Sequence, residues 1–398
     1  MLSYISLKVY TNFGTLPSSK IKINKYDIQL LLLWFALFPI DIPGKIVYFI
    51  QAIFAIIIFI NAFGEIRKVP MFPLVCLFPL AIIVSCVTNR NTILLTQTLR
   101  GFIYALLIID LYIFIHKYIR VRGDKELLHN LYAFSKVYFI LSSAWILVLC
   151  ITMRMTENLD QVYLVLGGKF NTAYLMLIFL ILFYSSWNGN KILSRNWKSG
   201  IFFVLALFSI IICQIIHVST GIVAISVFYI LVVMPKEFLK SINNPILLVV
   251  IIVTSMVTVF FISFILKQPF IQNLIVNILH EDLSLTGRIE LYKLLSPLLL
   301  KSGAWGGGFG SYVAAQLGYH GWYNAQNGLA EVILTYGYGG TIGFLLLCYV
   351  SSLKSKGYYK ALNAGIFTFI LIAIVEVPFD ARFIFLLALF MLLEKKEV

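Results

Sequence analysis

The stretch 245–266 reads PILLVVIIVTSMVTVFFISFIL and contains no charged residue. As an α-helix it would be roughly 33 Å long, and the hydrocarbon core of a bilayer is about 30 Å thick. The rest of the chain has a similar character, since 61% of its 398 residues are hydrophobic and only 12% are charged. With a mean hydropathy of +0.94, the sequence excludes a water-soluble globule and predicts a polytopic membrane protein.

Comparable apolar runs recur along the whole length, and we expect an all-α bundle of about 12 transmembrane helices. The last run is short enough to be re-entrant. No repeat or linker divides the chain, so a single membrane domain, 1–398, is expected, and its first span is expected to be retained as an anchor. The predicted spans are 27–43, 45–63, 69–88, 93–116, 131–152, 170–187, 200–217, 219–234, 245–266, 328–350, 360–377 and 379–393.

The distribution of Lys and Arg predicts the orientation of this bundle. With both termini in the cytoplasm, roughly twice as many cations fall in inner loops as in outer loops, as the positive-inside rule requires. We interpret the net charge of +14 as this topology signal and expect no nucleic-acid partner. The same orientation places one large loop, 267–327, on the periplasmic or extracellular face. Within it, 287–300 has helical periodicity and predicts a short surface helix.

Cysteine and histidine give no sign of a metal site. All five cysteines fall in predicted spans, where they behave as small apolar residues, and the five histidines have no ligand spacing. We therefore expect neither a disulfide framework nor a metal or other cofactor.

The outer loop and the span after it carry four motifs in order. They are GRIEL from Gly287, GGGFG at 306–310, WYNAQNGLAE at 322–331 and GYGG at 337–340. This series resembles the O-antigen ligase and Wzy-type polysaccharide polymerase superfamily. Two positions depart from the family pattern: Gln326 stands where the family has histidine, and Ser219 stands where arginine is common. Both departures favour a polymerase over a ligase.

The resemblance implies an inverting, metal-independent glycosyltransferase of the bacterial cytoplasmic (inner) membrane. Such an enzyme moves a growing glycan from undecaprenyl diphosphate onto a lipid-linked repeat unit, for O-antigen, capsule or other exopolysaccharide. Membrane lipid, a chain-length regulator and a flippase are the further partners it implies. The alternatives are a ligase that attaches a finished chain to an acceptor, and a carrier such as a flippase or secondary transporter.

A lipid-linked diphosphate needs cations, and guanidinium offers phosphate paired donors. Arg288, in the GR motif, and Arg100, about two turns inside the fourth span, are the candidates. Arg288 is open to interpretation as an interfacial arginine, and Arg100 as the structural partner of Asp110 or of a carbonyl group. The run containing Gly306, Gly308 and Gly310 is expected to line the same anion or sugar site with its amides.

A base is needed to take the proton of the acceptor hydroxyl. His320 and Glu331 are the candidates, although a solvated loop histidine and a helix-capping glutamate are the alternatives. Asn324, Gln326 and Asn327 are expected to orient hydroxyls or the diphosphate by hydrogen bonds. Glu376, Asp380 and Arg382, at the turn between the last two spans, are expected to form an ion cluster near this site.

Overall fold

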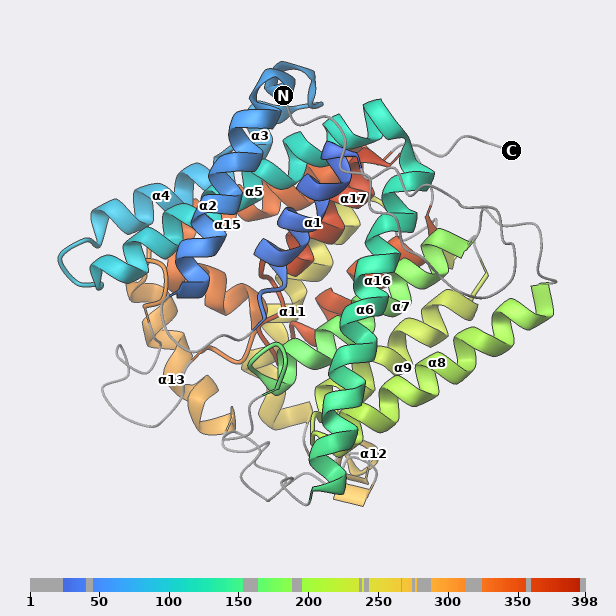
Figure 1. The fold of residues 1–398 in the computed structure, drawn as a ribbon. Helices are drawn as coiled ribbons and strands as arrows, with labels where there is room; N and C mark the ends of the chain where they lie inside the picture. The colour runs from blue at the N-terminus through green and yellow to red at the C-terminus, as the bar shows by residue number, and fades with distance from the viewer. Residues whose placement is uncertain are drawn as a thin grey trace.

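Every named element of the computed structural model is a helix, which confirms the all-α prediction (Figure 1). No β-strand forms in the part of the chain that the structure describes. The described residues are 24–40, 46–152, 164–187, 195–235, 238–239, 243–265, 267–273, 276–277, 288–311, 324–355 and 359–393.

The helices follow the apolar runs along the chain. Their bounds are α1 (Lys25–Leu37), α2 (Ile46–Ala62), the 3-10 helix η1 (Phe63–Lys68), α3 (Phe72–Val75), α4 (Leu77–Thr88), α5 (Leu95–Arg122), α6 (Asp124–Ile151), α7 (Lys169–Trp187), α8 (Arg195–Ile215), α9 (Ser219–Val233), α11 (Pro245–Ile265), α12 (Pro269–Asn273), α13 (Arg288–Lys301), α15 (Gly328–Leu353), α16 (Lys360–Ile372) and α17 (Ala381–Leu392).

A helix lies at each predicted span, but their lengths differ. Six helices among the described residues are long and apolar enough to cross a membrane, and five further apolar helices count 10–17 residues over the positions whose side chains are described, α11 among them over Pro245–Val257. The count of twelve spans therefore stays a prediction. The six long helices are Ile46–Lys68, Leu95–Arg122, Asp124–Ile151, Lys169–Ser186, Trp197–Ile215 and Gly328–Leu353.

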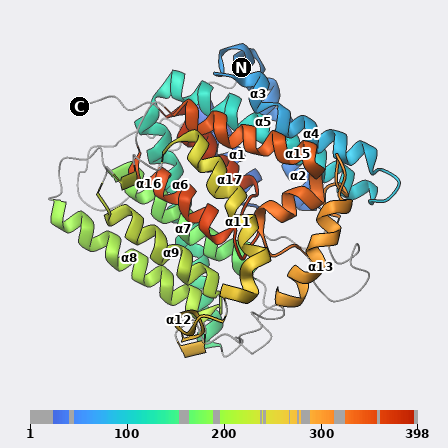
Figure 2. The same cartoon turned by 180° about the vertical axis from the view of Figure 1, so that it is seen from behind.

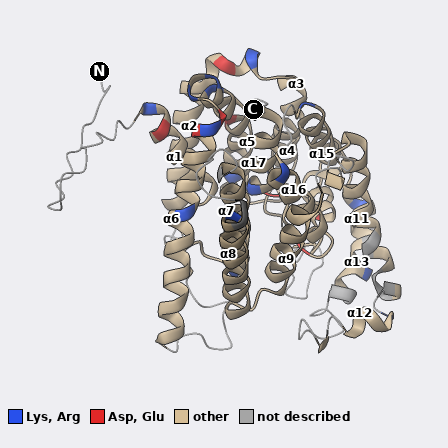
Figure 3. Ribbon diagram, turned by 90° about the vertical axis from the view of Figure 1, so that its right-hand side faces the viewer, with Lys and Arg blue, Asp and Glu red and all other residues tan. Residues whose placement is uncertain are grey.

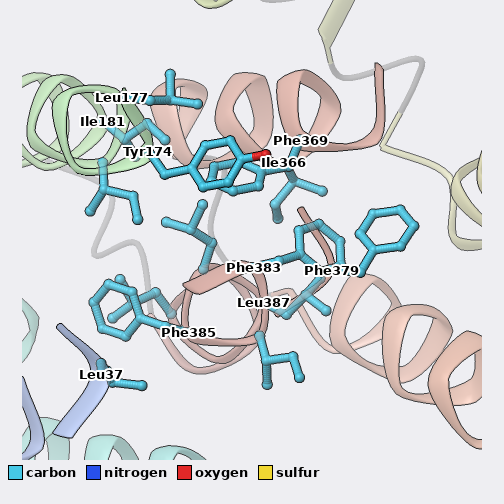
Figure 4. Packing of buried hydrophobic residues seen from close by; sticks show 14 of the residues in the cluster. Leu37, Tyr174, Leu177, Ile181, Ile366, Phe369, Phe379, Phe383, Phe385 and Leu387 are labelled. Atoms are coloured by element: carbon cyan, nitrogen blue, oxygen red, sulfur yellow. The ribbon is translucent and has the colours of Figure 1, made fainter. Parts of the chain in front are cut away.

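Two apolar helices illustrate two different environments. α17 is buried along nearly its whole length, and Phe383, Phe385 and Leu387 pack into a core shared with α7 and α16 (Figure 4). By contrast, Phe49 and Ile60 of α2 are 68% and 69% exposed. A helix that is apolar all round belongs in a protein core or in lipid. We interpret α17 as a core helix and α2 as a lipid-facing one.

The predicted surface helix of the large loop forms as α13. Leu291, Leu295 and Leu299 on one face of it are buried, whereas Leu294 and Leu300 are exposed, and the helix packs together with α11 and α15 (Figure 2). The helix is therefore part of the bundle, and the Tyr292 hydroxyl in its second turn reaches the Gln326 carbonyl just before α15 begins.

Charged residues gather at the end of the bundle where α1 begins, named here the charged end (Figure 3). Glu65 is buried there and accepts hydrogen bonds from Arg120, at 2.7 Å, and Lys68, at 3.3 Å. Asp27 accepts from Tyr118 over 2.6 Å. The basic residues among these are ones that the sequence assigned to the cytoplasm, and their side of the membrane stays a prediction.

Candidate functional site

A cavity of about 430 Å³ lies between the end of α1, the starts of α2 and α17, and the first turns of α5 and α7. By chain order these helix ends lie away from the charged end, on the side predicted to face outward. The cavity contains two arginines in an otherwise largely apolar bundle. Its polar and aromatic lining consists of Phe38, Tyr48, Gln51, Arg100, Tyr104, Asn171, Phe309, Asp380 and Arg382.

Arg100 is the predicted site residue that lines this cavity. Its guanidinium carbon lies 4.1 Å from the ring centre of Tyr48 and 5.9 Å from that of Phe309. It has no ion pair within the described ranges. Asp110 is ten residues further along α5, about 15 Å away on a helix, so the expected alternative pairing does not form. Both carboxylate oxygens of Asp110 are buried without a hydrogen-bond partner among the described residues.

Arg382, in the first turn of α17, supplies the second cation. Its Nε donates to Asp380 Oδ2 over 2.7 Å and one terminal nitrogen donates to Asn171 Oδ1 over 2.8 Å, while its guanidinium stacks on Tyr174. Asp380 also accepts from the Arg382 amide and caps α17. Of the expected cluster of Glu376, Asp380 and Arg382, the ion pair between Asp380 and Arg382 is confirmed, whereas Glu376 is buried and does not line the cavity. Together with Arg100, the cavity carries two cations and one carboxylate, an excess of positive charge that favours an anionic ligand.

Near the cavity, α15 is not a continuous helix, because Gly337 has φ 69° and ψ −173°. That conformation is essentially accessible only to glycine. In a regular helix the carbonyls of Leu334 and Thr335 would accept from amides four residues on. Here the amides of Gly307 and Gly308 take that place, at 2.8 and 2.9 Å.

The same break frees two amides of α15, and the segment 303–311, named here the glycine loop, accepts both. The amide of Tyr338 donates to the Gly303 carbonyl over 3.1 Å, and that of Gly339 donates to Ala304 over 2.9 Å. All four backbone groups thus regain a partner. Non-helical backbone at membrane depth requires such partners, since lipid offers none. The glycine loop therefore replaces one turn of the hydrogen bonding of α15.

Side chains near the end of α4 hold this arrangement in place. The Ser85 hydroxyl lies 2.5 Å from the Trp305 carbonyl oxygen and 3.0 Å from that of Thr335, so it bridges the loop and the broken helix. Asn89 donates to the Gly306 carbonyl over 3.0 Å. These contacts join α4, α15 and the glycine loop into one unit.

The glycines of the loop allow its backbone to lie close to the backbone of α15. Gly306, Gly308 and Gly310 have positive φ angles of 61°, 91° and 71°, and a Cβ on Gly306 would lie 2.5 Å from the Gly337 nitrogen. The sequence predicted that the amides of this run line an anion site. Instead, the amides at 307 and 308 bind α15, and the residue of the run that lines the cavity is Phe309.

Asn327, the last polar residue of the NAQNG motif, is fully buried. Its Oδ1 accepts from the Ala330 amide over 3.0 Å and caps α15, while its Nδ2 donates to the Ser255 and Ile374 carbonyls over 3.3 and 3.2 Å. Both side-chain donor hydrogens are therefore used within the fold. The arrangement gives Asn327 a structural role in place of the substrate contact that the sequence predicted.

The residues before it form a compact turn at the start of α15. Asn324 Oδ1 accepts from both the backbone and the side-chain nitrogen of Gln326, at 3.0 and 2.7 Å. Gln326 has a positive φ of 50°, and its carbonyl accepts from the Tyr292 hydroxyl over 2.8 Å. Neither Asn324 nor Gln326 lines the cavity.

Glu331, a predicted base, is attached to the same turn. Its Oε2 accepts from the Ala325 amide over 2.8 Å and its Oε1 lies 3.4 Å from the Thr335 hydroxyl. The backbone carbonyl of Thr335 also accepts from the Gly308 amide, next to the cavity residue Phe309, so the turn and the cavity are linked through the glycine loop. A role in holding the turn and a role in catalysis both remain open to Glu331.

Two predicted site residues are not placed by the structure. Arg288 is the first residue of α13, but its side chain lies outside the described residues, as does His320 altogether. Their roles stay predictions. No motif of the sequence marks Tyr48, Gln51 and Asn171, which line the cavity and lie far from the motifs in the chain.

Replacing Asn327 with alanine is expected to destabilise the protein by about 2–4 kcal/mol, because a helix cap and two buried hydrogen bonds are lost. Serine at this position, which caps the helix but cannot make both donor contacts, should fall between alanine and wild type. Thermal unfolding of the purified protein in detergent measures the series. Wild-type stability of Asn327→Ala would contradict the structural role.

The fold and the cavity define an all-helical membrane protein with an arginine-lined site at one end. No group of three or more His, Cys, Asp or Glu side chains that could hold a metal ion occurs in the described part of the chain. Comparisons of the chain with protein-family models, with curated proteins and with solved structures find no significant match.

Proposed function

We propose that the chain is a glycan polymerase that transfers a growing glycan from undecaprenyl diphosphate onto a lipid-linked repeat unit at the outer face of a bacterial cytoplasmic membrane. The observation that carries this proposal is the cavity between Arg100 and Arg382. Two guanidinium groups suit a diphosphate because each offers paired donors and stays charged. The cavity volume of about 430 Å³ is within the range of small-molecule sites.

The other lining groups suit a sugar and a lipid. Tyr48, Tyr104 and Phe309 offer aromatic faces, and Gln51, whose Nε2 is occupied by the Ala36 carbonyl at 2.9 Å, keeps its carbonyl oxygen as an acceptor. α2 forms one wall and exposes apolar residues outward. A prenyl chain is therefore able to lie in the bilayer beside this wall while its diphosphate occupies the cavity.

In the proposed reaction, the hydroxyl oxygen of the acceptor sugar attacks the anomeric carbon of the donor glycan. The bond from that carbon to the diphosphate oxygen breaks, and undecaprenyl diphosphate leaves with the electron pair. Arg100 and Arg382 would stabilise the charge that develops on the diphosphate. The hydroxyl proton passes to a base, for which Glu331 and His320 remain the candidates.

The break in α15 is a feature that secondary transporters also have, so it bears on whether the chain is a carrier. In secondary transporters the backbone groups freed at a helix break face the substrate or coupling ion. Here four of the groups at the break, the carbonyls of Leu334 and Thr335 and the amides of Tyr338 and Gly339, bind the glycine loop, so these four are not available to a solute. This observation favours the polymerase over a carrier, and the Gln326 in the family-like motif speaks against the ligase.

Deletion of the gene in its native host tests the proposal. Loss of a polymerase should leave acceptor glycans with a single repeat unit on electrophoresis, whereas loss of a ligase should leave the acceptor bare. Proteoliposomes containing the full chain and lipid-linked repeat units from that host should produce a ladder of longer glycans. Movement of the lipid-linked units across the bilayer without lengthening would instead support the carrier.

Arg288→Ala is expected to reduce the ladder to single-repeat glycans, because the GR motif predicts that this guanidinium contacts the diphosphate. The measurement is electrophoresis of the glycans from the native host carrying the variant. An undiminished ladder would contradict the predicted role of Arg288.

A further inference from the structure

We propose that Phe309 is a positioning residue whose ring, held by the glycine loop, fixes the guanidinium of Arg100 for binding the lipid diphosphate. The proposal rests on the proposed function, since it concerns the same cavity. In this proposal the glycine run positions the Phe309 ring in the cavity, whereas the sequence predicted that its backbone amides contact the ligand.

The position of Phe309 is set from three sides. Its ring centre lies 5.5 Å from that of Tyr104 and 5.9 Å from the guanidinium carbon of Arg100. Against its Cβ lies Gly101, where a side chain would come within 2.9 Å of the Phe309 Cβ. Residues 100, 101 and 104 share one stretch of α5, so this helix supplies both the cation and the seat for the ring.

The glycine loop keeps the ring on this seat. Gly308 and Gly310, on either side of Phe309, have positive φ angles, and the Gln97 side chain donates to the Gly310 carbonyl over 2.8 Å. On the other side, Gly308 donates to Thr335 in the broken helix. Both neighbours of Phe309 are thus fixed by hydrogen bonds to the bundle, and the ring has little freedom to leave α5.

The chemistry of guanidinium explains what the ring does. Aromatic rings attract a guanidinium through its flat faces, whereas its hydrogen-bond donors lie in its plane. Tyr48 and Phe309 are both within cation–π distance of Arg100, and within the described ranges no carboxylate pairs with it. Held by its faces, Arg100 keeps its in-plane donors for an anion in the cavity. Preorganisation of this kind raises affinity by reducing the ordering that binding requires.

The experiment measures binding of undecaprenyl diphosphate to the full chain in lipid nanodiscs. Phe309→Ala and Phe309→Leu should weaken binding by about 5- to 10-fold, whereas Phe309→Tyr and Phe309→Trp should bind like wild type. Phe309→Leu guards against a folding defect, since leucine keeps most of the buried volume. The thermal unfolding of each variant is measured alongside.

A double-mutant cycle separates positioning from general structural damage. In the Arg100→Ala background, Phe309→Leu should cause no further loss, because the group that it positions is absent. Equal losses in both backgrounds, or wild-type binding by Phe309→Leu, would overturn the proposal while leaving the proposed function intact. Failure of the wild-type chain to bind undecaprenyl diphosphate would instead overturn the proposed function.

Discussion

Replacing Arg100 with alanine lowers the affinity for undecaprenyl diphosphate by about 10- to 100-fold and abolishes the long-chain glycan ladder; this is the largest functional effect that we expect. A charge-assisted hydrogen bond contributes about 1.5–3 kcal/mol, and Arg100 is the cavity cation that has no carboxylate partner among the described residues. Arg382 already shares its charge with Asp380. The loss of Arg100 therefore removes most of the uncompensated positive charge.

Lysine at position 100 keeps the charge but lacks the planar fork and stacks less well on Tyr48. We expect Arg100→Lys to retain part of the affinity and to bind more weakly than wild type. Arg67→Ala is the matched control, since this arginine is exposed on the short helix η1, near the charged end. Equal affinity of Arg100→Ala and Arg67→Ala would show that the cavity is not the diphosphate site.

The helices could be located from the sequence, but their surroundings could not. Hydropathy detects the cost of placing polar groups in lipid or in a core, and this cost is similar in both. The apolar runs at α2 and α17 therefore both predicted membrane segments, the second of them short enough to be re-entrant, whereas α2 exposes Phe49 and α17 buries Phe383. Only the packing of distant helices separates the two cases.

A site residue could be predicted from the sequence only where its side chain is energetically unfavourable in an apolar span. Arg100 drew attention because a charge inside an apolar span is expensive, and it does line the cavity. Tyr48 and Asn171 carry no such cost, so nothing in their local sequence marks them. Their place in the cavity depends on which helix ends meet.

The glycine run shows a second limit. A loop that binds an anion and a loop that binds a broken helix both need positive φ angles and small residues, so the run of Gly306–Gly310 is compatible with either. The deciding feature is the break at Gly337, further along the chain, and the GYGG motif that contains this glycine does not reveal from sequence that the helix breaks there. Local pattern therefore predicted the conformation of the loop, but it gave no sign that the amides of Gly307 and Gly308 bind α15.

Replacing Gly337 with alanine is expected to destabilise the fold by roughly 3–5 kcal/mol, because the new side chain meets both backbone strain and crowding. A Cβ at this position would lie 2.4 Å from backbone atoms of Ala304, Trp305 and Gly306. Native proteins have only about 5–15 kcal/mol of stability in total. We therefore expect a large fall in melting temperature and in the yield of monodisperse protein.

A broken and a continuous α15 predict opposite changes in stability for Gly337→Ala. If α15 were a continuous helix, Gly337→Ala would stabilise it by about 1 kcal/mol, because alanine is the better helix former. Gly200→Ala is the matched control, since Gly200 lies in α8 with no atom within 4 Å of its built Cβ, and it should be neutral or stabilising. A stabilising Gly337→Ala would exclude the insertion of the glycine loop into α15. A destabilising Gly337→Ala beside a harmless Gly200→Ala supports it, since helix propensity alone would move both variants in the same direction.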